Sequence, residues 1–177
     1  MRFTLSLFAA NVCLTLPAQA QDHGPFHPAS VDVYFSPKGG ATEACVAAIA
    51  AAKTTINVQA YSFTSAPIAG ALVEAKKRGV KIEVILDKSQ KTEKYSEADF
   101  VAHAGIRTFI DAKHQIAHNK IMVIDGAVVV TGSFNFTKSA ESSNAENLLV
   151  IHDPKMAARY LANWAEHKAH SESYAGR

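Results

Sequence analysis

This sequence has few cysteines, little excess charge and no long apolar run, and each of these features excludes some functions. Its 177 residues include two cysteines and one tryptophan. The apolar run at the start is shorter than the roughly 20 residues that a membrane span needs. Lysine and arginine (18) nearly balance aspartate and glutamate (16), so the formal net charge is only +2. No overall positive field therefore directs the chain to nucleic acid, and any anion-binding site must be local.

The N-terminus has the pattern of a secretory signal peptide. Arg2 precedes a short apolar run, and residues 18–20 read AQA, which matches the A-x-A cleavage pattern. We expect residues 1–20 to be removed, residues 21–30 to form a loose lead-in, and residues 31–177 to form a single domain. An uncleaved anchor is the alternative. The mature protein is then expected to be periplasmic or secreted, with no stable membrane association.

Cysteine chemistry contributes little to the expected function. Cys13 lies in the signal peptide, so Cys45 is the one cysteine that remains, and an internal disulfide is excluded. Cys45 sits in an alanine-rich helical run without an adjoining basic residue, which favours a small buried side chain over a reactive thiol.

Runs typical of strands alternate with helical patterns along the rest of the chain. Strands are expected at 31–36, 55–63, 80–87, 106–110, 116–124, 127–134 and 145–152. Helices are expected near 41–53, 66–78, 97–104 and 154–170. This order predicts an α/β fold in which a mixed β-sheet is flanked by helices, as an α/β/α sandwich.

The stretch HNKIMVID, residues 118–125, places two polar side chains on one face of an apolar strand. His118 and Lys120 are two residues apart and therefore point the same way. Asp125-Gly126 is a strong signal for a two-residue hairpin turn. With such a turn Ile124 would pair with Ala127, and the rest of the register would follow from that pair.

In that register, polar residues of both strands gather on one face of the hairpin. Lys120 lies opposite Thr131, His118 lies opposite Ser133, and Asn135 continues the same face. An imidazole, an ammonium, a hydroxyl and a carboxamide suit a tetrahedral oxyanion such as phosphate. Convergent carboxylates for Mg²⁺ are lacking, and imidazole can itself act as a nucleophile. The residues therefore predict phosphoryl chemistry without a metal or other cofactor.

These residues resemble the signature of the phospholipase D superfamily. His118-x-Lys120-(x)4-Asp125 matches HxK(x)4D, residues 132–135 match GSxN, and Glu146-Asn147 follows. The similarity runs from about residue 31 to the end and is strongest to short bacterial endonucleases with a single motif. The resemblance implies a phospholipase D-like domain that hydrolyses phosphodiesters.

The resemblance also implies roles for individual residues. His118 would attack phosphorus to form a phosphohistidine, and a second His118 would protonate the leaving oxygen. Because the chain holds one motif, it would form a homodimer with the active site at the interface. Glu146 would orient a His118 imidazole. Asp125 in the turn and Gly132 would be structural rather than catalytic.

Three functions stay open at this point. The expected one is an endonuclease of low specificity that cleaves DNA, with RNA as a further nucleic-acid substrate. A lipid phosphodiesterase and a non-catalytic nucleic-acid-binding module are the alternatives, because the fold alone does not select the substrate. Two other histidines, His167 and His170, lie at helical spacing, but two ligands are too few to predict a metal site. His114 is expected in a solvated loop.

Overall fold

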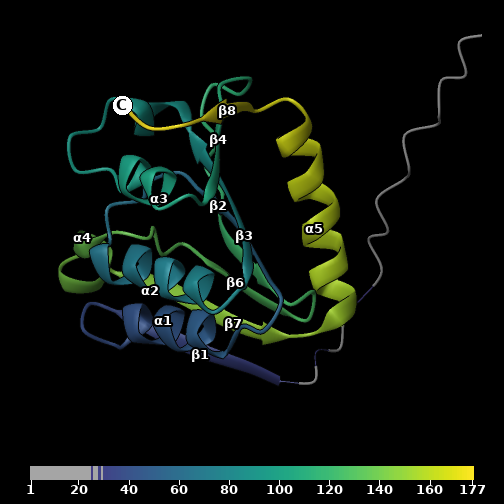
Figure 1. Cartoon of the computed structure of the whole chain (residues 1–177). Coiled ribbons are helices and arrows are strands. Elements are labelled where there is room, and N and C mark those ends of the chain that lie inside the picture. The colour runs from purple at the N-terminus through teal and green to yellow at the C-terminus, as the bar shows by residue number, and fades with distance from the viewer. Residues whose placement is uncertain (1–24, 26–27, 29) are drawn as a thin grey trace, which may run out of the picture.

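The computed structural model describes residues 25, 28 and 30–177 (Figure 1). The expected signal peptide, and most of the expected lead-in, lie outside the described residues. The strands are β1 (Ser30–Ser36), β2 (Thr55–Ala60), β3 (Lys81–Asp87), β4 (Arg107–Asp111), β5 (Lys120–Ile124), β6 (Val128–Gly132), β7 (Glu146–His152) and β8 (Glu172–Tyr174). The helices are α1 (Ala41–Ala51), α2 (Ala66–Lys77), α3 (Ala98–His103), α4 (Lys138–Ser142) and α5 (Pro154–Ala169), with a short 3-10 helix, η1 (Lys88–Lys91).

All eight of these strands form one sheet, in the order β1-β7-β6-β5-β2-β3-β4-β8. β2, β3 and β4 are parallel neighbours, whereas the other pairs are antiparallel, so the sheet is mixed. α1, α2 and α3 lie on one face, and α5 runs along the other (Figure 1). The predicted α/β fold, a mixed sheet between two layers of helices, is confirmed.

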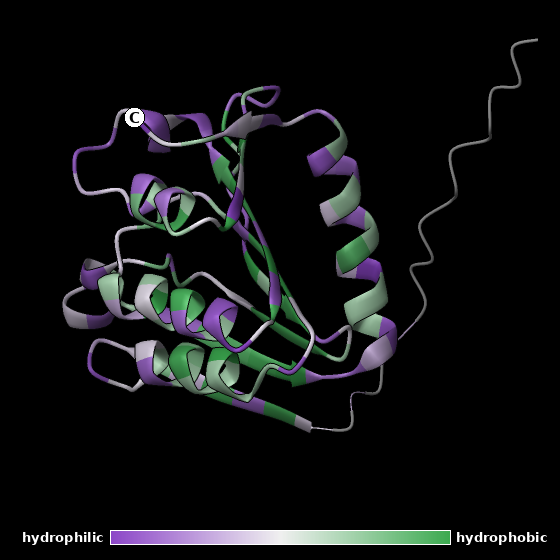
Figure 2. Cartoon of the chain, viewed as in Figure 1, coloured by the Kyte–Doolittle hydropathy of each residue, from purple (hydrophilic) through white to green (hydrophobic). Residues whose placement is uncertain are grey.

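Each face of the sheet buries its own apolar cluster. The larger cluster lies under α1 and α2 and includes Ile49 and Leu72, and the smaller one lies under α5 and includes Val123 and Trp164. The indole N–H of Trp164 donates a hydrogen bond of 2.9 Å to the carbonyl of Val58, which fixes α5 on the central strand β2. Figure 2 shows the apolar sides of the helices turned toward the sheet. This packing follows from amphipathic helices on a sheet whose central strands are apolar on both faces.

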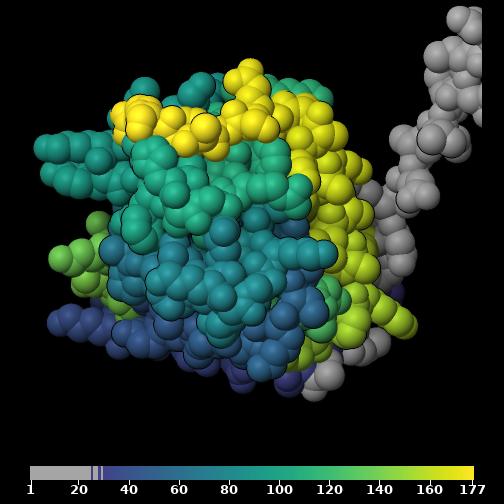
Figure 3. Space-filling view, in the orientation of Figure 1, coloured from purple at the N-terminus to yellow at the C-terminus, as the bar shows by residue number. Residues whose placement is uncertain are grey.

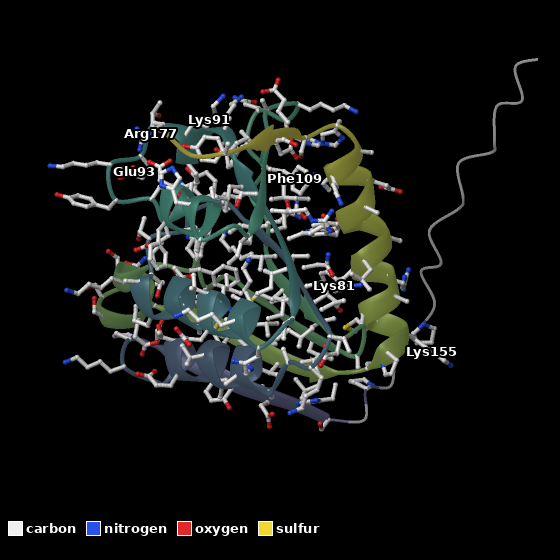
Figure 4. The ribbon with its side chains drawn as sticks, in the orientation of Figure 1. Lys81, Lys91, Glu93, Phe109, Lys155 and Arg177 are labelled. Atoms are coloured by element: carbon white, nitrogen blue, oxygen red, sulfur yellow. The ribbon has the colours of Figure 1, made fainter. Side chains whose placement is uncertain are left out.

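The short elements η1, α4 and β8 were not predicted from the sequence, because so few residues carry no periodic pattern. β8 pairs antiparallel with β4 and extends the sheet at that edge. Two residues of the C-terminal segment bind Asp99 of α3: the Tyr174 hydroxyl donates to its carboxylate, and Arg177 forms an ion pair of 2.9 Å. The C-terminal segment therefore lies across the end of the molecule formed by β4 and α3 (Figures 3 and 4).

The predicted register of the β5–β6 hairpin is wrong by one residue. The turn is at Asp125-Gly126, both with positive φ (52° and 62°), but Ile124 pairs with Val128 and not with Ala127. Ala127 is an additional residue on the β6 side: its N–H donates to Ile124, while its carbonyl accepts from Asp153. Such a bulged turn has the same Asp-Gly signature as the two-residue turn.

The register changes which residues share a face. Thr131 lies opposite Ile121, so it does not lie opposite Lys120. Since paired residues point to the same side of the sheet, Thr131 is turned away from the face of Lys120. The expected hairpin face therefore does not exist as predicted, and Ser133 instead contacts Glu146, whose negative charge acts on Lys120.

Asp125 ties this turn to the loop before β2. Its carboxylate accepts hydrogen bonds from the backbone N–H groups of Lys53, Thr54 and Thr55, at 2.7 to 2.9 Å, and from the Thr54 hydroxyl. Burial alone would raise the pKa of Asp125, but these bonds outweigh it and lower the pKa from its usual 3.8 to about 2. The side chain therefore acts as an anionic clamp between two loops.

We predict that Asp125→Ala lowers the free energy of unfolding by about 2–3 kcal/mol near neutral pH, because three backbone donors lose a charged acceptor. A carboxyl whose pKa is depressed by folding stabilises the protein above its unfolded pKa, and this contribution is lost as the pH falls toward the folded pKa. The difference between wild type and variant should therefore be constant above about pH 5 and shrink below about pH 4. Denaturant unfolding at several pH values measures it.

Glu43→Ala, which removes an exposed carboxylate from α1, is the matched control and should change stability little. A stability difference for Asp125→Ala that does not depend on pH would contradict the clamp.

Candidate active site

The candidate residues gather at one edge of the sheet. β1, β2, β3 and β6 end at this edge, whereas β5 begins there with Lys120 and β7 begins there with Glu146. Loops that follow parallel strands commonly carry binding sites in α/β folds. The chain segments after β2 and after β6 meet here, since Phe63 and Phe136 form a parallel bridge.

Lys120 and His118 form the centre of the site. Lys120 is 8% exposed, and its ammonium donates a hydrogen bond of 2.8 Å to the His118 carbonyl. The same Nζ lies 3.1 Å from His118 Nδ1. The His118 ring also contacts the ring of Tyr61, with 4.6 Å between centroids. The imidazole is therefore exposed but held from two sides, with Nε2 directed away from the ammonium.

The ammonium is a partly desolvated cation. Burial lowers the pKa of Lys120 below its usual 10.5, and the negative charge of Glu146 opposes this shift. Its Nζ also lies 5.4 Å from the centre of the Tyr61 ring. A cation in such a place gains more from an approaching anion than a solvated lysine does.

Gly132 brings Ser133 to the start of β7. Its φ is 147°, and a Cβ at this position would lie 2.3 Å from the carbonyl oxygen of Asn147. Only glycine allows this approach. The Ser133 hydroxyl then donates to Glu146 Oε2 at 2.6 Å and accepts from the Asn147 N–H at 3.1 Å. The structural role expected for Gly132 thus has a direct physical basis.

Asn135 lies between two buried phenylalanines, Phe134 and Phe136, in the segment after β6. Its Oδ1 is buried and has no hydrogen-bond partner among the described residues. An unpaired buried polar atom is costly and often marks a functional site. The amide nitrogen has no partner within the part of the chain that the structure describes either, so it remains available to donate to a ligand.

Glu146 does not contact His118 within this chain. Its two carboxylate oxygens accept from Ser133 and from the Asn144 amide, at 2.6 and 3.2 Å. Among the interactions of the described residues, His118 Nδ1 meets only the Lys120 ammonium. The orienting role expected for Glu146 therefore stays a prediction. Asp125 lies at the opposite end of the hairpin, away from these groups.

Sequence reasoning missed two contributors to the site. Tyr61 follows directly after β2, and its contact with His118 depends on the pairing of β2 with β5, which no local pattern shows. Asn147 follows Glu146 in the motif but was given no role, and the structure shows that its backbone N–H and its side-chain amide both donate to the Ser133 hydroxyl, at 3.1 and 3.4 Å. A surface pocket of about 260 Å³ lies elsewhere, between α1 and the turn end of the sheet, and Asp125 and His152 are among its lining residues.

One edge of the sheet thus carries an exposed imidazole, a buried ammonium, a free amide and a hydroxyl–carboxylate pair. Such a set suits the hydrolysis of a phosphodiester. A family model described as "Cardiolipin synthase, PLD-like domain" matches residues 45–168, most of the chain. The chain therefore belongs to the phospholipase D superfamily and is a phosphodiesterase.

Individual relatives agree with this assignment. "Phospholipase D" of Rickettsia prowazekii is 42% identical over 144 residues, which cover 81% of this chain and 70% of the relative. The crystal structure of Nuc, a phospholipase D family member from Salmonella typhimurium, is 42% identical, with a TM-score of 0.79 over 82% of this chain and 97% of Nuc. NucT from Helicobacter pylori shares the fold at 22% identity, with a TM-score of 0.76 over 82% of this chain and 99% of NucT.

Proposed function

We propose that this protein is a metal-independent endonuclease of low sequence specificity that cleaves DNA through a phosphohistidine. The observation that carries the proposal is the placement of the exposed His118 imidazole beside the buried Lys120 ammonium. The site is proposed to act outside the cytoplasm, on the basis of the signal-peptide pattern in residues 1–20. Recovery of the protein from the cytoplasm with Met1 still in place would contradict this location.

Two observations favour a nucleic acid over a lipid. The single HxK motif is typical of the short bacterial endonucleases, and Nuc is 42% identical over nearly its whole length. As a separate finding, no helix in the part of the chain that the structure describes has the length and apolar character to cross a membrane. A lipid phosphodiesterase is the second candidate, because the rickettsial relatives carry the name phospholipase D.

In the proposed reaction two displacements occur at phosphorus. The Nε2 lone pair of His118 attacks, the bond to the leaving oxygen breaks, and a second imidazole gives that oxygen its proton. The second imidazole then removes a proton from water, which attacks the phosphohistidine and releases His118. Lys120 and Asn135 stabilise the charge on the other phosphate oxygens.

The second imidazole is proposed to come from a second copy of the chain. One chain offers a single HxK cluster. For Nε2 of His118 to act as a nucleophile, the proton of the neutral ring must be on Nδ1. In the single chain, however, Nδ1 faces the Lys120 ammonium. A carboxylate supplied by the second chain would accept this N–H and complete the site. Edge strand β1 supports this, because it exposes Val31, Val33 and Phe35 along its length, and Phe35, which is 66% exposed, pairs with Asn147 at the start of β7.

We predict that the wild-type protein cleaves plasmid DNA in EDTA, well below its unfolding temperature, and that His118→Ala abolishes cleavage. Lys120→Ala and Asn135→Ala should each reduce kcat by about 10²–10³-fold, as loss of an oxyanion donor does. Plasmid, RNA and phospholipid vesicles are tested in parallel, and circular dichroism confirms that each variant is folded.

The matched control is His152→Ala, which removes an exposed histidine of β7 outside the site and should keep wild-type activity. Near wild-type cleavage by any of the three site variants would overturn the assignment. Turnover of phospholipid but not of nucleic acid would select the second candidate function.

The dimer is tested by mixing chains. Wild-type and His118→Ala chains with different affinity tags are refolded together, and heterodimers are isolated by two successive purifications. We expect sedimentation of a dimer and no completed turnover by the heterodimer, because one of the two imidazoles is missing. A fully active monomer, or heterodimers that keep half the wild-type rate, would contradict the proposal.

A further inference from the structure

A second cluster of ionisable side chains lies at the C-terminal end of α5, beside the end of β4 and at the same edge of the sheet as the candidate active site, and the reaction proposed above does not use it. It consists of Asp111 at the end of β4, His114 in the connection to β5, His167 in the last turn of α5, and His170 directly after that helix. We name these four residues the DHHH cluster. Phe109, which lies toward α5 in Figure 4, marks the sheet face that Asp111 shares by alternation.

The ring nitrogens of the cluster converge on one carboxylate oxygen. Asp111 Oδ2 lies 2.8 Å from His167 Nδ1, 3.1 Å from His114 Nδ1 and 3.3 Å from His170 Nε2. One ligand atom from each of the four residues can be chosen so that all lie within 4.8 Å of one another. The end of β4 and the loop after it each supply one potential ligand atom, and the end of α5 supplies two.

These separations are close to the ligand shell of a tetrahedral metal ion. Zn²⁺ binds imidazole nitrogen and carboxylate oxygen at 2.0–2.2 Å, so neighbouring ligand atoms of a tetrahedron are about 3.3–3.6 Å apart. The contacts to Asp111, at 2.8 to 3.3 Å, must lengthen slightly, and the widest separation in the set, up to 4.8 Å, must shorten by about 1 Å, which histidine side chains can do by turning their rings. Histidine and carboxylate together suit zinc better than magnesium or calcium, which prefer oxygen ligands alone.

Hydrogen bonds alone can also hold these side chains in place. Asp111 Oδ2 meets all three ring nitrogens, His114 Nδ1 also lies 3.3 Å from Oδ1, and the Lys113 N–H donates to Oδ1 at 3.1 Å. These four donors fill the roughly four lone-pair sites of a carboxylate. The ring centroids of the three histidines lie 4.8 to 5.4 Å apart, so three imidazoles already surround one carboxylate, and each neutral ring has a lone pair that a divalent ion can accept.

We propose that the DHHH cluster is a structural site for one Zn²⁺ ion, with all four protein ligands bound. Three of the four side chains are largely buried: Asp111 is fully buried, and His167 and His170 are 14% and 21% exposed, whereas His114 is 43% exposed. The second oxygen of Asp111 accepts from the Lys113 N–H at 3.1 Å, which orients the carboxylate as an outer-shell partner does. Four protein ligands leave no open position for catalysis at the metal.

The site would fasten α5 to the segment that leads to the catalytic histidine. His114 lies four residues before His118, and the intervening Ala117 N–H is held by Asp87 Oδ2 at 2.8 Å. None of the four ligands contacts His118, whose ring is held by Tyr61 and Lys120. The metal would therefore raise stability and leave the chemistry at phosphorus unchanged.

The site was not predicted from the sequence, which indicated no metal. His167 and His170 gave a pair at helical spacing, but Asp111 and His114 come from a strand end and a loop some 55 residues earlier in the chain. Their approach depends on how α5 packs on the sheet. Two histidines alone are weak grounds for a metal site, and the other two ligands have no recognisable spacing to them.

The proposal is tested on the untagged full-length protein, because a histidine tag would itself bind metal. Apoprotein prepared with a chelator is titrated with Zn²⁺ in a calorimeter, and with Co²⁺ in a spectrophotometer, since Co²⁺ has intense visible bands in tetrahedral sites. We expect one equivalent of Zn²⁺ to bind and a tetrahedral Co²⁺ spectrum. At Zn²⁺ concentrations about 100 times Kd, Tm should rise by about 5–10 °C.

His167→Ala and Asp111→Asn should each weaken zinc binding by more than about 100-fold, since even outer-shell changes cost 10–100-fold. His152→Ala is the matched control and should bind zinc as the wild type does. Both ligand variants should keep DNA cleavage well below their unfolding temperature, so this test is independent of the proposed nuclease function. Substoichiometric zinc, an octahedral Co²⁺ spectrum, or an unchanged affinity in His167→Ala would overturn the site.

Discussion

The candidate active site depends on one cation that the fold holds largely out of water. Lys120 begins a strand in the middle of the sheet, and 8% of its surface is exposed. Desolvation of an ammonium costs several kcal/mol, and burial accordingly lowers its pKa. The His118 carbonyl and the charge of Glu146 offset part of this cost. A bound phosphate would offset the remaining desolvation cost. This accounts for a buried lysine at the edge of the sheet where the candidate site lies.

Other features at the same edge also fit a site that is completed by a ligand. Asn135 keeps a buried oxygen without a partner, and Gly132 adopts a backbone conformation that other residues would strain. Gly132 lets Ser133 reach Glu146, and the negative charge of Glu146 acts on Lys120. The opposite end of the hairpin is fully satisfied by comparison, because Asp125 accepts four hydrogen bonds from the loop before β2. The HxK(x)4D motif thus divides into an end that holds the candidate catalytic residues and an end that anchors the turn.

The sequence predicted the fold class and most element positions, because long amphipathic helices and apolar strands carry strong periodic patterns. It also placed His118 and Lys120 on one face, since alternation along a strand is local. The hairpin register was wrong because an Asp-Gly turn does not reveal the additional residue Ala127. Tyr61 and the DHHH cluster were missed because their contacts join segments distant in sequence.

The central claim is that His118 itself forms a bond to phosphorus, and the stereochemical course of cleavage tests it most directly. A DNA phosphorothioate of known configuration at phosphorus is cleaved in heavy-oxygen water, and the configuration of the chiral product is determined. Two successive in-line displacements, through a phosphohistidine, each invert the phosphorus centre, so our account predicts net retention. Net inversion would show that water attacks the phosphodiester directly, which would contradict the account.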